Sequence, residues 1–97
     1  MNAPDRIAMI RRRIESAIRP SVLDVEDESH LHHGHAGARD GRGHFRVRIV
    51  AEHFNGLRPL QRHRIVYAAV GELMNTDIHA LAITALTPAE NARRSGT

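Results

Sequence analysis

The chain has 97 residues, which is enough for one small domain with a modest core. It contains no cysteine, and this excludes disulfides, a thiol nucleophile and an all-cysteine metal site within the chain. The chain has fourteen basic residues, all arginine, and eleven acidic residues. The resulting formal charge of +3 permits a nucleic acid or an acidic protein as partner but requires neither. No apolar run approaches the roughly 20 residues of a spanning helix, and the charged start is unlike a secretory signal, so we expect a soluble, cytoplasmic protein without a membrane partner.

The first segment, residues 4–19, is predicted to be a helix. Its apolar residues recur at spacings of three and four and therefore share one stripe: Ile7, Ile10, Ile14, Ala17 and Ile18. Pro4 suits the first turn of this helix, and Pro20 ends it. Residues 21–29 then alternate as a half-buried strand that ends in an acidic cluster.

Residues 28–43 are predicted to form a long loop, because they contain four glycines and no apolar periodicity. Connections of this length are uncommon unless they serve a function or are disordered. The loop holds four closely spaced imidazoles, which are candidate metal ligands: His30, His32, His33 and His35. No regular element fixes their spacing, which disfavours an autonomous metal site in this loop. Their titration near pH 6.5 would make the charge of the loop sensitive to acid.

Residues 44–54 give the clearest strand pattern, followed by a turn at Asn55-Gly56. Phe45 and its apolar partners point one way, while His44 lies on the opposite parity with Arg46 and Arg48. We therefore expect His44 to be a solvated polar residue at the strand edge, and keep it as an alternative metal ligand.

A second helix is predicted over residues 58–74, with Pro59 in its first turn. Its buried side is expected to comprise Leu60, Val66, Ala69, Val70, Leu73 and Met74, and its exposed side Arg58, Gln61, Arg62 and Glu72. Arg58, Arg62 and Arg64 form either a phosphate-contacting patch or an ordinary solvated helix face, and the sequence leaves both interpretations open.

Residues 78–86 are the third predicted strand, in which His79 shares the parity of Leu81 and Ile83. A last short helix begins after Thr87, a helix-capping residue followed by Pro88. The element order is α-β-β-α-β-α. It predicts an α+β fold with a mixed three-stranded sheet and helices on one face, in a single domain over residues 1–92 with a flexible tail at 93–97.

No pattern of the sequence favours an enzyme. There is no nucleophile elbow and no phosphate-binding loop, and no acidic residue is paired with a base.

The element order and several motifs together resemble the BolA family. The motifs follow in order over about residues 5 to 90: DES at 27–29, HF at 44–45, FNG at 54–56, RHRIVY at 62–67, IHALAI at 78–83 and TP at 87–88. Two positions depart from the family pattern. Arg42 lies in GRG where an acidic residue and a serine are common, and Asn91 stands where tryptophan is usual.

This resemblance implies a fold similar to the second class of KH-like folds and a non-enzymatic adaptor role in iron–sulfur metabolism and iron homeostasis. Such proteins bind a monothiol glutaredoxin and share a [2Fe–2S] cluster with it and with glutathione. The ligands implied here are His79 and, by position after DES, His32; His30, His33, His35 and His44 are the alternatives. The alternative function is a DNA-binding transcriptional regulator that uses the second helix, and a weak homodimer of the free protein is left open.

Overall fold

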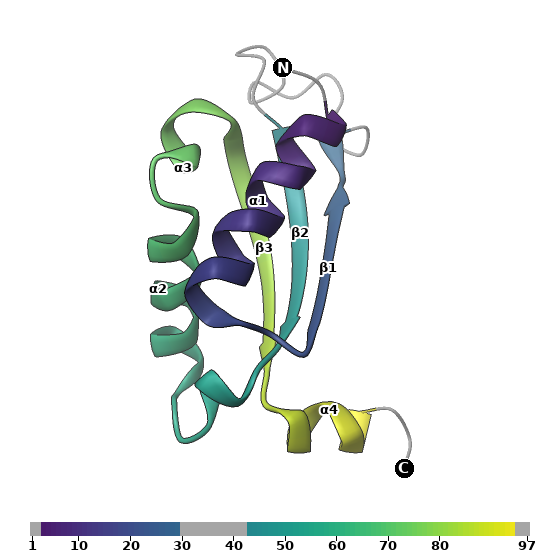
Figure 1. The fold of residues 1–97 in the computed structure, drawn as a ribbon, viewed down its shortest axis with the longest axis vertical. Helices are drawn as coiled ribbons and strands as arrows, with labels where there is room; N and C mark the ends of the chain where they lie inside the picture. Colours follow the sequence, from purple (N-terminus) through teal and green to yellow (C-terminus); the bar gives the residue numbers. More distant parts are fainter. Residues whose placement is uncertain (1–2, 30–42, 95–97) are drawn as a thin grey trace.

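The computed structural model describes residues 3–29 and 43–94. The observed elements follow the predicted order, with two additional short helices (Figure 1): α1 (Ala3–Ile18), β1 (Val22–Asp27), β2 (Gly43–Val50), η3 (Glu52–Phe54), α2 (Pro59–Val70), α3 (Leu73–Thr76), β3 (Ile78–Leu86) and α4 (Pro88–Arg94). No helix in these two ranges is both long and apolar enough to cross a membrane.

The three strands form one mixed sheet in the order β1-β2-β3, as predicted. Strands β1 and β2 are antiparallel, with Asp24 opposite Arg48, whereas β2 and β3 run parallel. Helices α1 and α2 lie side by side on one face of this sheet (Figure 1). The parallel pair follows from the helical crossover, because two parallel strands cannot be joined by a tight turn.

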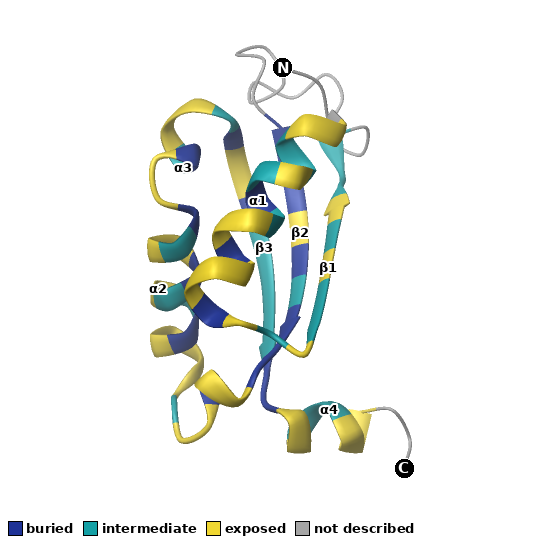
Figure 2. Cartoon of the chain, in the orientation of Figure 1, coloured by how far each residue is buried: buried dark blue, intermediate teal, exposed yellow. Residues whose placement is uncertain are grey.

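The core lies between this helix pair and the sheet, where the burial pattern alternates along β2 (Figure 2). Phe45, Val47 and Ile49 project toward the helices and are at most 2% exposed. The stripe of α1 supplies Ile10, Ile14 and Ile18 from the other side. Two residues predicted to be buried are not: Ala17 is exposed, and Leu60 is 60% exposed in the first turn of α2.

The predicted helix over residues 58–74 is two helices. Helix α2 ends at Val70, and Gly71 follows with a φ of 53° while its N–H still donates to the carbonyl of Tyr67. This left-handed backbone, which glycine adopts readily, turns the chain before α3 begins at Leu73.

The last helix is longer than predicted, because α4 continues to Arg94. Thr87 caps it as expected: the N–H of Glu90 donates to Thr87 Oγ1 at 3.1 Å, and the Glu90 carboxylate accepts from the N–H of Thr87 at 2.9 Å. Asn91, at the position where the resembled family usually has tryptophan, accepts a hydrogen bond from Arg48. Residues 95–97 of the predicted tail lie outside the described residues.

Candidate functional site

A β-bulge places His79 at the start of β3. Gly43 of β2 is opposite Ile78, but the next residue, His44, is opposite Ala80, so His79 is the extra residue of the ladder. The side chain of Ile78 is fully buried and anchors this point, whereas His79 is exposed. The predicted parity of His79 with the buried Leu81 is therefore broken by the bulge, which turns the imidazole toward solvent.

His44 contacts His79 across this bulge. The two ring centroids are 5.0 Å apart and the planes are inclined by 49°. The expectation that His44 is a solvated edge residue is wrong, because only 8% of it is exposed. Strand alternation correctly predicted on which face of the sheet His44 lies. It could not predict that His44 is buried on that face.

The end of β1 holds His44 by its backbone. The N–H of His44 donates to Ser29 Oγ at 3.0 Å, and its carbonyl accepts from the N–H of Glu28 at 2.7 Å. Asp27 Oδ1 in turn accepts from the N–H of Ser29 at 2.8 Å. This bond forms the local turn that an aspartate typically makes with the backbone two residues later. The DES motif thus fixes the backbone of one histidine of the pair.

Gly43 is required at this end of the sheet for steric reasons. A Cβ atom at this position would lie 2.6 Å from Cε2 of the buried Phe45 ring and 3.1 Å from Ser29 Oγ. The phenyl ring belongs to the close-packed core, so it has little room to move. The G-H-F sequence therefore couples the position of His44 to the packing of Phe45.

The described residues include only some of the predicted metal ligands. No group of three or more His, Cys, Asp or Glu side chains suited to hold a metal ion occurs within residues 3–29 and 43–94. The loop candidates His30, His32, His33 and His35 lie outside the described residues. Of the predicted ligands, the structure brings together His79 and the alternative His44.

The predicted arginine patch divides into two exposed side chains and one buried side chain. Arg58 and Arg64 are exposed on α2, but Arg62 is 8% exposed, which contradicts its predicted place on the solvated face. Its guanidinium donates to the carbonyls of Leu57 and Ala85 at 2.9 and 3.0 Å and to both carboxylate oxygens of Glu90 at 2.6 and 3.2 Å. Arg62 therefore ties α2, β3 and α4 together.

This ion pair changes the acidity of Glu90. The hydrogen bond from Arg62, helped by the one from the backbone of Thr87, lowers the pKa of Glu90 to about 2. Sequence reasoning missed the pair, although the T-x-x-E spacing of a capping box already marked Glu90 as a residue with local partners.

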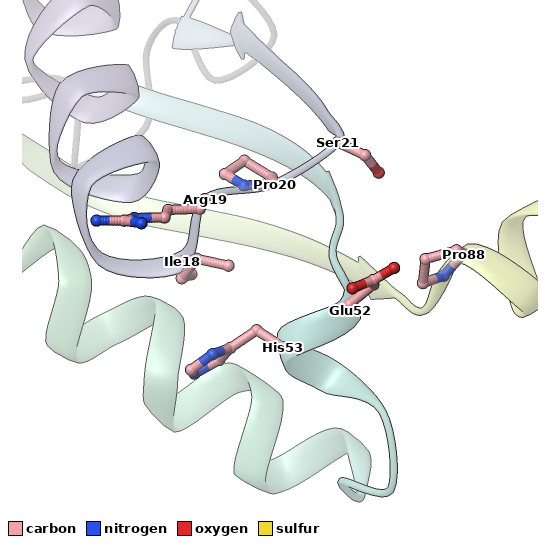
Figure 3. Close-up of a pocket in the computed structure, with 7 residues that line it drawn as sticks. All are labelled: Ile18, Arg19, Pro20, Ser21, Glu52, His53 and Pro88. Atoms are coloured by element: carbon pink, nitrogen blue, oxygen red, sulfur yellow. The ribbon is translucent and has the colours of Figure 1, made fainter.

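A separate cavity of about 480 Å³ lies where α1 ends, next to η3 and the start of α4 (Figure 3). Ile18, Arg19, Pro20, Ser21, Glu52, His53 and Pro88 line it. It is at the opposite end of β2 from His44, because η3 follows the carboxyl end of that strand. Its walls mix a cation, an anion and prolines, so the lining favours no particular class of ligand.

Known proteins are similar to this chain in sequence and in fold. The family model described as BolA-like protein matches residues 14–90. Human BolA-like protein 1 is 48% identical over 83 residues, which are 86% of this chain and 58% of the human protein. The DNA-binding transcriptional regulator BolA of Escherichia coli is 42% identical over 83 residues, covering 81% of this chain and 76% of that protein. The solved BolA domain of SufE1 from Arabidopsis thaliana superimposes with a TM-score of 0.78 at 37% identity and covers 93% of this chain and 98% of that one.

Proposed function

This chain belongs to the BolA-like protein family, and from this premise we propose that it is a non-enzymatic adaptor that binds a monothiol glutaredoxin and shares a [2Fe–2S] cluster with it. The chain spans about 58% of the length of human BolA-like protein 1, so the proposal concerns the domain that both share. The observation that carries it is the exposed imidazole of His79, set at a bulge beside a second histidine.

The residues of the site fit a cluster that is held jointly with a partner. Iron–sulfur clusters are normally held by thiolates, and this chain has no cysteine. An imidazole nitrogen is also an accepted ligand, as in Rieske-type centres, where two histidines replace two cysteines on one iron. The partner would supply the thiolates from its active-site cysteine and from glutathione, and this chain would supply imidazoles.

We assign His79 and His32 as the ligands of this chain and give His44 a supporting role. His79 is exposed, so a partner can reach it without rearrangement of the sheet. His44 is almost covered, and its ring packs against that of His79. Packing of this kind restricts the orientation of a ligand, which is how a neighbouring shell tunes a metal site.

The test mixes the apo protein with cluster-loaded glutaredoxin and follows the visible circular dichroism. Wild type should give a spectrum distinct from that of the glutaredoxin homodimer, and His79→Ala and His32→Ala should each lose it. His44→Ala should retain a shifted spectrum, because it changes the surroundings of a ligand and not the ligand set. His53→Ala, an exposed histidine at the other end of the sheet, is the matched control.

Two results would contradict the proposal. One is a spectrum that does not change when the proteins are mixed. The other is a spectrum that is the same for wild type and His79→Ala while His44→Ala abolishes it, which would transfer the ligand role to His44. Far-ultraviolet circular dichroism of each variant separates loss of the site from loss of the fold.

A second candidate function, DNA binding, is favoured by the names of bacterial relatives and by two exposed arginines. The relatives in Escherichia coli and Haemophilus influenzae are named DNA-binding transcriptional regulators. Arg58 and Arg64 are exposed on α2, whereas the Arg62 guanidinium already donates hydrogen bonds to Glu90 and to two carbonyls. The interface proposed here therefore uses Arg58 and Arg64 and excludes Arg62.

The DNA-binding test compares the salt dependence of duplex binding. Arg58→Gln with Arg64→Gln should weaken binding and reduce the slope of log K against log salt by about two, one for each phosphate contact. Arg46→Gln with Arg93→Gln, which removes two exposed arginines outside α2, is the charge-matched control. An equal loss in the two double variants would indicate attraction by net charge alone.

A further inference from the structure

Two arginines and a threonine line a cavity of about 330 Å³ at the end of the sheet remote from His79. Its walls come from three elements: Arg48 from β2, Thr84 and Leu86 from β3, and Arg94 from α4. Strand β3 begins next to His79 and ends at Leu86, so the cavity and the histidine pair lie at opposite ends of one strand (Figure 1). The cavity is thus separate from the site proposed for the cluster.

Neighbouring side chains hold Arg48 in place. Its Nη2 donates to Asn91 Oδ1, and its Nη1 lies 3.7 Å from Asp24 Oδ2 on the adjacent strand. The side chain of Asp24 is 62% exposed, so solvent screens this ion pair and little of the positive charge is cancelled. A guanidinium has five N–H donors, and these two contacts leave several for a ligand.

Arg94 adds a second positive charge at the rim. It is exposed in the last turn of α4, and its side chain makes no hydrogen bond or ion pair with any residue of 3–29 or 43–94. Glu90 of the same helix is engaged with Arg62, so it does not neutralise Arg94. The guanidinium groups of Arg48 and Arg94 and the hydroxyl of Thr84 thus line the cavity, and within the described residues the only carboxylate paired with them is the solvated Asp24. This arrangement favours an anion that accepts several hydrogen bonds.

We propose that this cavity binds the phosphate group of a small molecule. Guanidinium groups match phosphate oxygens with paired N–H donors, and Thr84 adds a hydroxyl. The volume is near the lower limit of small-molecule sites and exceeds that of a phosphate group, which leaves room for a small organic part against Leu86. Binding of a nucleic acid would call for cations that follow the backbone over a longer surface.

The experiment titrates inorganic phosphate into the full-length chain and follows amide chemical shifts by NMR. Saturable shifts are expected at Arg48, Thr84 and Arg94, beyond those caused by chloride at equal ionic strength. Arg48→Gln and Arg94→Gln should each weaken binding roughly tenfold, the loss expected for a charge-assisted contact. Arg93→Gln is the matched control and should bind like wild type, because Arg93 lines the neighbouring cavity, to which Arg94 also contributes, but does not line this one.

Three outcomes would overturn this proposal. Chloride could produce the same shifts, or Arg93→Gln could weaken binding as much as Arg94→Gln; either result would indicate general attraction by positive charge. Binding of a DNA duplex through Arg48 and Arg94 without binding of phosphate would replace the small molecule by a polymer. Arg94 lies at an exposed helix end, so its variant is expected to fold, and its melting temperature checks this.

Discussion

At the scale of single residues, Arg19 has a backbone conformation that its residue type disfavours. It is the non-glycine residue with a positive φ, 54°, in the described part of the chain. A left-handed backbone costs an ordinary L-residue about 1–2 kcal/mol. The neighbours offset this cost, because the N–H of Arg19 donates to Glu15 at 3.1 Å and Ser21 bonds to Val50 of β2 at 2.8 Å. The turn from α1 into the sheet thus imposes the conformation on Arg19.

We predict that Arg19→Gly stabilises the protein. Glycine removes the left-handed penalty but adds entropy to the unfolded chain, which leaves a net gain of about 1 kcal/mol or somewhat less. Thermal denaturation followed by circular dichroism should show a melting temperature about 4–8 °C higher for a full 1 kcal/mol. Arg12→Gly, inside α1 and exposed, should lower stability by about 1 kcal/mol. A fall of similar size in both variants would contradict the argument.

At the scale of elements, the sequence contained enough information for the strands, the first helix and the last helix cap. Alternation along residues 45–49 identified the buried face of β2, and Thr87-Pro88 located the start of α4. These features depend on contacts close in sequence, which periodicity and capping rules describe.

The features that could not be predicted depend on contacts distant in sequence. Arg62 looks like any exposed arginine until α4 folds back and brings Glu90 to it, 28 residues later. The outward turn of His79 depends on one bulge between β2 and β3, and a bulge leaves no period in a single strand. The sequence therefore supplied His79 and His44 as candidate residues, but the surroundings of each could not be predicted from it.

The link between α2 and α4 should make stability depend on acid. The pKa of Glu90 is lowered from 4.5 to about 2 in the folded protein, so its ionised form stabilises the fold above pH 4.5. That contribution is lost as the pH falls from 4.5 to about 2, because in this range the unfolded chain takes up a proton at Glu90 and the folded protein does not. Glu90→Gln should melt at a lower temperature than wild type at neutral pH, and the difference should shrink to near zero at about pH 2.

The matched control for this prediction is Glu72→Gln, which removes an exposed carboxylate that does not bond to Arg62. It should show a smaller change of the melting-temperature difference across the same pH range. A wild type and Glu90→Gln pair whose melting curves stay parallel from pH 7 to pH 2 would show that the Arg62–Glu90 pair does not contribute through ionisation.

At the scale of the whole molecule, the two ends of the sheet differ in what their polar side chains contact. The histidine pair lies where β3 begins, and the Arg62–Glu90 link joins α4 to the other end through the carbonyl of Ala85. Ala85 lies six positions after His79 in β3. At about 3.3 Å per residue, the distance between them along the strand is about 20 Å. The first end is expected to serve a partner and the second to hold the fold together.

This division predicts that the two ends are energetically independent. His79→Ala should change the free energy of unfolding by less than about 0.5 kcal/mol, because His79 is exposed, while it removes the cluster spectrum. Arg62→Met should cost about 2–3 kcal/mol, since it removes the guanidinium donor of two carbonyls and leaves the Glu90 carboxylate with the N–H of Thr87, and should retain that spectrum below its melting temperature. In the double variant the two costs should add within about 0.5 kcal/mol in urea denaturation, as expected for sites this far apart. A coupling energy well above that value would show that β3 transmits strain between its ends, and the roles assigned to them would then have to be joined.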